Sequence, residues 1–182
     1  LKKRVEWPIR RSRFIASIRP SDVFLTFYPR SGNTMLCYMI AEIQGKKAAK
    51  TQDINCDFKS CIPTLCEWPQ GILEHFATLP DPRIFVEIEP YGHPAFANVI
   101  YLIRDPRDVM VSYWHYHRLN LPDFDRPMDE FIMTNKHWPC PWDEHVNGWV
   151  KNHHSKLLVI KFEELKENTA EVLKRVLDFV GI

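Results

Sequence analysis

The sequence predicts an α/β fold in which a mostly parallel central sheet is flanked by helices. Short apolar runs alternate along the chain with stretches of helical periodicity. The apolar runs are nearly continuous, which is typical of strands buried on both faces of a parallel sheet. At 182 residues the chain suits one domain with a substantial core, so we expect a single domain over 1–182.

The first part of the chain is expected to be a basic, irregular lead-in over residues 1–20, attached to the body by Trp7 and Phe14. The next segment, 23–44, reads as a strand, a tight loop and a helix, because an apolar, β-branched run is followed by a turn and then by helical spacing. Gly45 is expected to end this helix.

The later elements continue the alternation of strands and helices. Residues 46–68 have no clear period and are predicted as loop with short helical pieces. Asp105 can cap the helix that follows it, with Pro106 at the first helical position. The remaining predicted strands are 83–88, 98–103 and 157–162, and the remaining predicted helices are 69–79, 127–136, 142–153 and 169–180.

Composition limits the classes of partner. The chain has 24 basic and 23 acidic residues, a balance that argues against a nucleic-acid partner. No apolar run is long enough to span a membrane, and no signal-peptide pattern is present. Five cysteines in a chain that needs no disulfides favour reduced thiols, so we expect a cytoplasmic protein. Cys56, Cys61 and Cys66 are spaced more widely than zinc ligands usually are, so no metal site is expected.

The loop from Pro29 to Thr34 has the features of a site for phosphate or sulfate. A helix N-terminus leaves backbone N–H groups free, and its dipole favours negative charge. Arg30 adds a fixed cation with a planar donor fork, and Gly32 lets the backbone approach an oxyanion closely. Short side-chain donors follow at Ser31, Asn33 and Thr34. The alternative is an ordinary strand-to-helix turn capped by Asn33.

A second candidate anion site follows a later strand. Arg104 ends the strand 98–103, and Ser112 lies about two helical turns further on. A guanidinium and a hydroxyl in this arrangement can share a second phosphate. The alternative is that Arg104 pairs with Asp105 or Asp108. Since ligands bind beyond the carboxyl ends of parallel strands, we expect Arg104 to lie in one crevice with the loop 29–34, Glu87–Glu89 and Phe162.

Together these motifs resemble a known family, the sulfotransferases that use 3′-phosphoadenosine 5′-phosphosulfate (PAPS). Tyr28–Thr34 resembles the 5′-phosphosulfate loop, Y-P-[KR]-S-G-[TN]-T. Arg104–His115 is similar to the 3′-phosphate motif, R-[ND]-P-[KR]-D-V-x-V-S-Y-[YW]-H. Trp142–Trp149 and Phe162–Asn168 are similar to W-x-x-H-V-x-x-W and Y-E-D-[LM]-K-E-[DN]. The motifs stand in family order over residues 20–182.

The resemblance implies a P-loop-like, three-layer α/β fold with PAPS as sulfuryl donor, PAP (3′-phosphoadenosine 5′-phosphate) as product and no metal. The sulfuryl group would pass in line to a hydroxyl or amine of a small-molecule acceptor. The donor would contact the segments 23–44 and 98–119. Arg30 would stabilise the transferring group, Ser31–Thr34 would hold the 5′-phosphate, and Arg104 with Ser112 would hold the 3′-phosphate.

The chain departs from the family pattern on the strand that carries the catalytic base. The family has K-[TS]-H-x-P, whereas Val86 stands here at the lysine and Ile88 at the histidine. A glutamate before a similar proline resembles the base of heparan-type sulfotransferases. We therefore expect Glu87 to be the base, with Glu89 second and His93 third. The alternative is that the glutamates face water or pair with an arginine.

Three further departures concern the donor. Met35 stands where a tryptophan commonly packs on adenine, and Phe162 stands where a tyrosine is usual, so stacking can persist there without the hydroxyl contact. The sequence stops at Ile182, before the family's C-terminal G-x-x-G-x-x-K segment. Either donor binding is weaker than in the family, or that segment lies beyond this sequence. The acceptor is expected to contact residues 46–68 and 119–141.

The sequence leaves three functions to compare. The first is an active sulfotransferase with a carboxylate base. The second is a non-catalytic protein that binds PAP or PAPS, favoured by Val86 and Ile88. The third is a phosphotransferase that uses a nucleoside triphosphate, against which the absence of a Walker A ending counts. The sequence does not indicate an oligomeric state.

Overall fold

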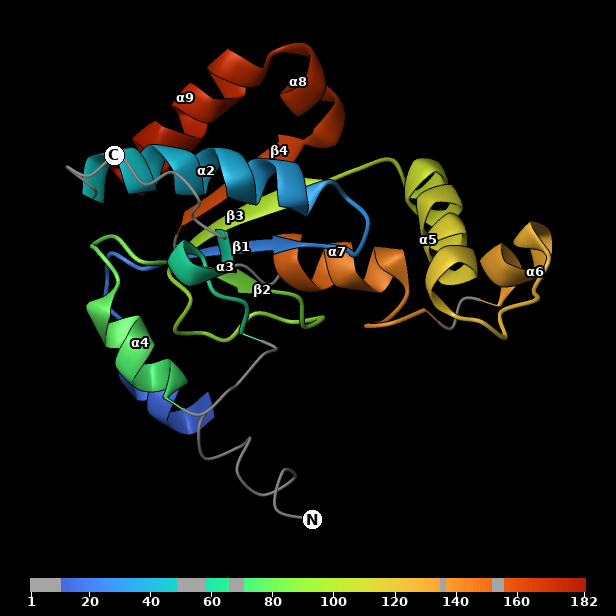
Figure 1. The fold of residues 1–182 in the computed structure, drawn as a ribbon, viewed down its shortest axis with the longest axis horizontal. Coiled ribbons are helices and arrows are strands. Elements are labelled where there is room, and N and C mark those ends of the chain that lie inside the picture. Colours follow the sequence, from blue (N-terminus) through green and yellow to red (C-terminus); the bar gives the residue numbers. More distant parts are fainter. Residues whose placement is uncertain (1–10, 49–57, 66–70, 135–136, 152–155) are drawn as a thin grey trace.

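The computed structural model describes residues 11–48, 58–65, 71–134, 137–151 and 156–182. Its central sheet, seen in Figure 1, has the strand order β2-β1-β3-β4, and every neighbouring pair is parallel. The strands are β1 Val23–Phe27, β2 Ile84–Glu87, β3 Asn98–Ile103 and β4 Lys156–Lys161. The predicted α/β fold with a parallel sheet is therefore confirmed.

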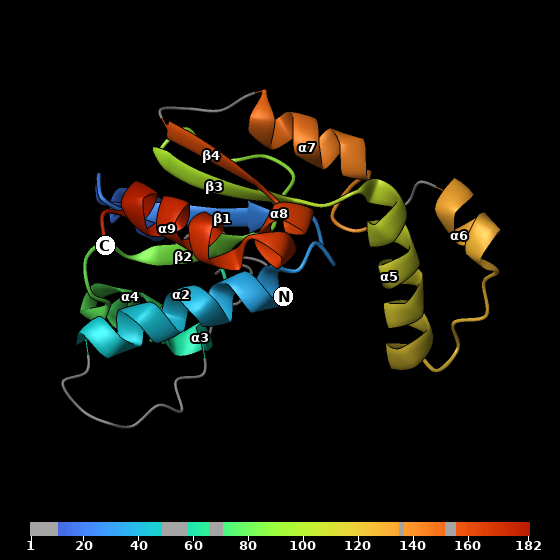
Figure 2. The ribbon, with the colours of Figure 1, turned by 90° about the horizontal axis from the view of Figure 1, so that it is seen from above.

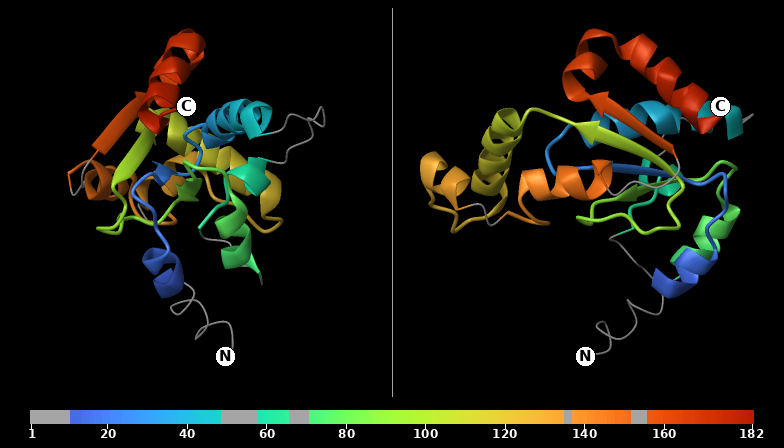
Figure 3. Two further views of the ribbon diagram at one scale, coloured as in Figure 1. Left: turned by 90° about the vertical axis from the view of Figure 1, so that its left-hand side faces the viewer. Right: turned by 180° about the vertical axis from the view of Figure 1, so that it is seen from behind.

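Helices cover both faces of this sheet, as Figures 2 and 3 show. Their bounds are α2 Asn33–Ala48, α3 Phe58–Cys61, α4 Ile72–Thr78, α5 Pro106–Asn120, α6 Met128–Met133, α7 Trp142–Val150, α8 Phe162–Glu167 and α9 Thr169–Val180. The first core layer joins α2, α8 and α9 to one face of the sheet. Residues 11–16, which are helical, join α4 and α7 on the other face.

The second core layer is largely aromatic. Phe24 stacks on Phe96 with ring centroids 3.8 Å apart, and Phe14 meets Phe85 edge to face at 5.0 Å. Phe14 is 1% exposed, so the expectation that it attaches the N-terminal segment to the body is confirmed. Trp7, its expected companion, lies outside the described residues.

A third cluster joins the end of the sheet to α5 and α6. Tyr28, Val109, Tyr113 and Phe131 form its buried part. Figure 2 shows both helices beyond the end of the sheet toward which β1 points. Asp105 caps α5 as predicted, since its carboxylate accepts the N–H of Arg107 at 2.8 Å. The loop after β1 therefore faces α5. Among the described residues, no helix has the length and apolar character needed to cross a membrane.

Three local predictions were wrong. Gly45 does not end α2, which continues to Ala48, because an interior glycine costs a helix only about 1 kcal/mol and the packing of Leu36 and Ile40 outweighs it. Residues 11–16 are helical rather than irregular. Phe162 begins the short helix α8 rather than ending a strand. Each error follows from tertiary packing that local periodicity does not contain.

One buried ion pair ties the N-terminal segment to the start of β2. The guanidinium of Arg83 donates to both carboxylate oxygens of Asp22, and its Nη2 also donates to the carbonyl of Ser17 at 2.8 Å. Arg83 is 3% exposed and Asp22 is 1% exposed. Removing one member of a buried pair leaves an uncompensated charge, which costs more than the pair itself contributes.

Asp22→Asn is therefore expected to lower the free energy of unfolding by about 3 kcal/mol. Urea denaturation followed by circular dichroism measures it. The matched control is Glu164→Gln, which breaks the pair of Glu164 with Arg175, in which both side chains are 41% exposed. That variant should lose less than about 1 kcal/mol. Equal losses in the two variants would contradict the expectation.

Candidate functional site

The loop after β1 has an uncommon backbone conformation. Arg30 has a φ of 71° and Gly32 a φ of 93°, both in the left-handed region. A residue with a side chain pays on the order of 1 kcal/mol to adopt that conformation. The N–H of Ser31 donates to the carbonyl of Tyr28 at 3.2 Å, which closes the turn. The first N–H groups of α2, from Asn33 onward, have no intrahelical acceptor.

Arg104 holds this loop from the end of β3. Its Nη1 donates to the carbonyl of Arg30 at 3.1 Å, and its guanidinium lies over the ring of Phe162 at 4.7 Å. Asp108 lies 3.9 Å from its Nη2, which agrees in part with the alternative drawn from the sequence. Its Nε is buried without a hydrogen-bond partner among the described residues. Arg104 thus has a donor that the described protein groups do not use.

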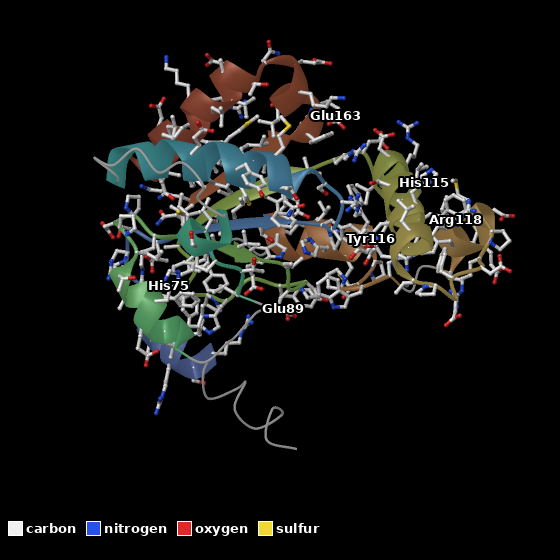
Figure 4. All side chains as sticks on the ribbon, viewed as in Figure 1. His75, Glu89, His115, Tyr116, Arg118 and Glu163 are labelled. Atoms are coloured by element: carbon white, nitrogen blue, oxygen red, sulfur yellow. The ribbon has the colours of Figure 1, made fainter. Side chains whose placement is uncertain are left out.

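The side chain of Arg30 points from the loop toward α5. Its Nε donates to the Oγ of Ser112 at 3.3 Å, and its guanidinium lies over the ring of Tyr116 at 4.9 Å. Figure 4 shows Tyr116 on the side of α5 that faces the sheet. The expected phosphate ligands Arg30 and Ser112 are therefore brought together, and Tyr116, which the sequence did not single out, lies beside them.

Gly32 lies against the ring of Phe162. A Cβ at Gly32 would come within 2.2 Å of Cε2 of that ring, so the close approach requires glycine for space as well as for conformation. Phe162 is the first residue of α8 and lies between Gly32 and the guanidinium of Arg104. The loop, the end of β3 and the start of α8 therefore meet at one place.

The other loop residues differ in exposure. Ser31 is fully buried, and its Oγ has no hydrogen-bond partner among the described residues. Asn33 is half-buried and Thr34 is exposed. Met35 is half-buried and packs against the first core layer. Two orphaned polar atoms, Oγ of Ser31 and Nε of Arg104, thus border one loop that also presents helix N–H groups.

Glu87 ends β2 with a fully buried side chain. Its Oε1 accepts the N–H groups of Ile88 at 3.0 Å and Glu89 at 3.1 Å, and its Oε2 lies 3.3 Å from Nη2 of Arg11. Burial raises the pKa of Glu87, while Arg11 and the two backbone N–H groups oppose that shift. The ion pair corresponds to the alternative in which a glutamate pairs with an arginine.

The other two candidate bases have different surroundings. Glu89 is half-buried, and its carbonyl accepts the indole N–H of Trp149 at 2.8 Å. The Nδ1 of His93 accepts the N–H of Ala95 at 3.1 Å, so this histidine stabilises its own turn. None of the three candidates has a described contact with Arg30.

Strand alternation separates Glu87 from the residues on either side of it. Val86 and Ile88, which stand at the family's lysine and histidine, pack against the first core layer. Glu87 lies on the opposite face of the sheet, in register with Thr26 of β1. Thr26 is in turn in register with Tyr101 of β3. The carboxylate is thus on the face covered by α7, not on the face covered by α2.

A buried histidine completes that face. His145 on α7 receives a hydrogen bond from the hydroxyl of Tyr101 at 2.8 Å, and its Nε2 lies 3.3 Å from the carbonyl of Ile88. Burial lowers the pKa of His145 to about 4. The sequence had identified this histidine only as part of a motif. The signal that could have found its role was the i, i+4 spacing of His145 and Trp149 on one helix face.

A cavity of about 400 Å³ opens beside Arg104 where β3, β4 and α7 approach one another. Trp142 and Lys161 also line it, and the indole N–H of Trp142 is buried without a partner among the described residues. Across the described residues, no group of histidine, cysteine and acidic side chains is arranged to hold a metal. Cys56 and Cys66 lie outside those residues.

Comparison with known proteins identifies the family. The sequence model of the sulfotransferase domain matches residues 20–182, so the chain belongs to the sulfotransferase family. Human Sulfotransferase 4A1 is 30% identical over 179 residues, which cover 91% of this chain and 61% of that protein. Human Sulfotransferase 2A1 is 27% identical over 191 aligned residues, which cover 95% of this chain and 64% of that protein. The chain spans about three fifths of the length of these curated relatives.

Solved structures agree on the fold. Mouse sulfotransferase SULT7A1 complexed with PAP has a TM-score of 0.65 at 24% identity, covering 91% of this chain and 59% of that one. Retinol dehydratase in a complex with retinol and PAP has a TM-score of 0.59 at 25% identity, and the match covers 90% of this chain and 61% of that one. The P-loop-like α/β fold implied by the motifs is confirmed.

The buried His145 is expected to make stability depend on pH. Its folded pKa of about 4 lies below its ordinary value of 6.5, so between these values the unfolded chain takes up a proton that the folded protein does not. Stability should therefore fall with decreasing pH, by up to about 1.4 kcal/mol per unit. Urea denaturation at pH 7 and pH 5 should show a larger loss for wild type than for His145→Asn. The exposed control His115→Gln should behave as wild type, and equal slopes in all three proteins would refute the assignment.

Proposed function

We propose that this chain carries the PAPS site of a sulfotransferase that transfers a sulfuryl group to a hydroxyl or amine of a small acceptor. The observation behind the proposal is that two arginines, Arg30 and Arg104, are linked by hydrogen bonds at the loop after β1. Arg104 donates to the carbonyl of Arg30, and Arg30 donates to Ser112. Orphaned donors at this loop fit an anionic ligand with several acceptor oxygens.

Each residue has a defined part in this proposal. The 5′-phosphate would lie on the N–H groups at the start of α2, with the side chains of Ser31, Asn33 and Thr34 beside it. Arg104 and Ser112 would hold the 3′-phosphate. Met35 and Phe162 would border the nucleotide. Arg30 would release the hydroxyl of Ser112, donate instead to the sulfuryl group in transfer, and stabilise the negative charge on that group. PAPS supplies the activated sulfuryl group when bound.

A carboxylate base completes the proposed reaction. The acceptor oxygen or nitrogen forms the new bond to sulfur as the bond from sulfur to the 5′-phosphate oxygen breaks, and the acceptor's proton passes to Glu87. The raised pKa of Glu87 supports this role because it makes the carboxylate a better proton acceptor. Within the described part of the chain, Oε2 of Glu87 accepts no hydrogen bond, but Arg11, whose Nη2 lies 3.3 Å away, would have to move aside for an acceptor. Glu89 is the second candidate.

A non-catalytic PAP-binding protein is the second candidate function. It is favoured by the ion pair of Glu87 with Arg11 and by the position of Glu87 on the face opposite Val86 and Ile88. Both candidates use the same nucleotide segments, 23–44 and 98–119. We expect a small-molecule acceptor, no nucleic acid and no membrane as partners, with a cytoplasmic location, in either case.

Calorimetric titration with PAP tests the nucleotide site. Wild type should bind with micromolar affinity, and Arg104→Ala should weaken binding by about ten- to a hundredfold, because charge-assisted hydrogen bonds are lost. The control is Arg175→Ala, whose side chain lies outside both nucleotide segments, is 41% exposed and pairs with Glu164. It should bind as wild type does. An equal effect of both substitutions, or no binding by wild type, would count against the site.

Replacement of the proposed base separates the two functions. Glu87→Gln should lower the transfer of radiolabelled sulfuryl from PAPS to 2-naphthol by about a hundredfold and change PAP affinity by less than about twofold. Glu89→Gln is the companion variant. Activity lost only in that variant would move the base to Glu89. Full activity in both variants would exclude a carboxylate base, and inactive wild type that binds PAP would favour the non-catalytic candidate.

A further inference from the structure

Just after β2, side chains bind the backbone N–H and carbonyl groups of Ile88 and Glu89. Beyond Glu87 the register of β1 and β2 ends. The N–H groups of Ile88 and Glu89 both donate to Oε1 of Glu87. The carbonyls of the same two residues accept from His145 and Trp149 of α7. The bound groups belong to three consecutive peptide units: Glu87 binds the N–H groups of units 87–88 and 88–89, and α7 binds the carbonyls of units 88–89 and 89–90. The 88–89 unit is therefore held by both Glu87 and α7.

α7 can approach this segment because it presents a glycine. A Cβ at Gly148 would lie 2.4 Å from the carbonyl oxygen of Pro90 and 2.7 Å from Cδ1 of Tyr91. A backbone oxygen cannot give way as the end of a flexible side chain can. The hydroxyl of Tyr91 donates to Glu144 on the same helix. Positions 144, 145, 148 and 149 form one helical face, and that face meets residues 88–91.

The protonation of His145 follows from its partners. A carbonyl oxygen only accepts, so Nε2 of His145 carries the proton that it donates to Ile88. Nδ1 is then the acceptor, and the hydroxyl of Tyr101 donates to it. His145 is therefore a neutral donor fixed by Tyr101. It has no free lone pair with which to act as the base.

We infer that His145, Gly148 and Trp149 are positioning residues for the carboxylate of Glu87. His145 holds the 88–89 peptide unit, whose N–H binds that carboxylate, Trp149 holds the next peptide unit, and Gly148 lets α7 approach this segment. The inference rests on the proposed function only for its consequence in catalysis. The positioning itself is a property of this chain whether or not it transfers a sulfuryl group. Among the residues that the structure describes, the charged or titratable groups around Glu87 are Arg11 from the N-terminal segment, Glu89 on its own strand end, Tyr101 on β3 and His145 on α7.

The test follows the titration of Glu87 by NMR in protein labelled with carbon-13 at glutamate side-chain carboxyls, with Glu87→Gln providing the assignment. The variants are Gly148→Ala, which adds the obstructing methyl, and Trp149→Phe, which removes the indole N–H from the carbonyl of Glu89 together with part of a buried ring. The first control is Gly45→Ala, since a Cβ there meets nothing within 4 Å. The second is Trp114→Phe, since Trp114 also donates to a backbone carbonyl, that of Arg126.

Both variants should raise the midpoint of Glu87 by about 0.5 unit or more, because the N–H bonds that favour the charged carboxylate weaken. Exchange of the N–H groups of Ile88 and Glu89 should quicken about tenfold. The controls should change neither quantity. If Gly148→Ala does not fold, Trp149→Phe decides. Folded variants with the wild-type midpoint and exchange rates would overturn the inference.

Sulfuryl transfer from PAPS to 2-naphthol separates this inference from the proposed function. If wild type is active, Trp149→Phe should lower kcat, calculated per PAP-binding site counted by calorimetry, about tenfold and leave the KM for PAPS unchanged. A general loss of stability would instead lower the number of PAP-binding sites and leave kcat per site unchanged. If wild type is inactive and does not bind PAP, the proposed function fails, while the titration of Glu87 still decides the positioning.

Discussion

The contact between Arg104 and the carbonyl of Arg30 is the constraint on which the rest of the site depends. The loop after β1 places Arg30 and Gly32 in left-handed conformations, one of them at a cost. A strained loop persists only where its surroundings determine it fully. Here β3 contributes Arg104, α5 contributes Ser112, and α8 contributes the ring against Gly32. Side chains from two segments remote in sequence from the loop, the β3–α5 unit and the start of α8, thus fix one turn.

The same contacts explain why an anion suits the loop. Two guanidinium groups lie at one turn, next to the N-terminus of α2, where the helix dipole is positive. The carboxylate of Asp108 lies 3.9 Å from Nη2 of Arg104 and partly balances its charge. Within the described part of the chain no carboxylate pairs with Arg30, which donates to Ser112. Arg30 instead donates to a neutral hydroxyl and lies over an aromatic ring. A bound polyanion would supply the charge that these partners lack.

The sequence predicted the elements that depend on local chemistry. β3 and α9 have the predicted bounds, and the cap of α5 by Asp105 was predicted because proline and aspartate have defined places at a helix start. The candidate phosphate residues could be proposed from the sequence because the motif keeps them within a few residues of a strand end. The end of α2 was wrongly predicted at Gly45. Burial of one face of α2, which the sequence alone does not quantify, outweighed the low helix propensity of glycine.

What the sequence could not supply was contact between distant segments. The pairing of Arg11 with Glu87 joins residues that no periodicity relates, and the basic cluster at the N-terminus gave no reason to single out Arg11. The hydrogen bonds of His145 and Trp149 needed the turn after β2 to be placed first. Such contacts arise from the topology, so only the assembled fold could show them.

The alternation of side chains along β2 between the two faces of the sheet limits where an acceptor can lie. Because successive side chains of a strand face opposite sides, a base at Glu87 cannot occupy the place of a base at Ile88. The family's lysine and histidine positions are filled here by apolar residues that join the first core layer. A carboxylate one residue away serves the other face, beside α7. If this chain transfers a sulfuryl group through Glu87, the acceptor must therefore approach from the side of Arg11 and α7, and the hydrogen bonds that fix the segment 88–91 become part of the acceptor site.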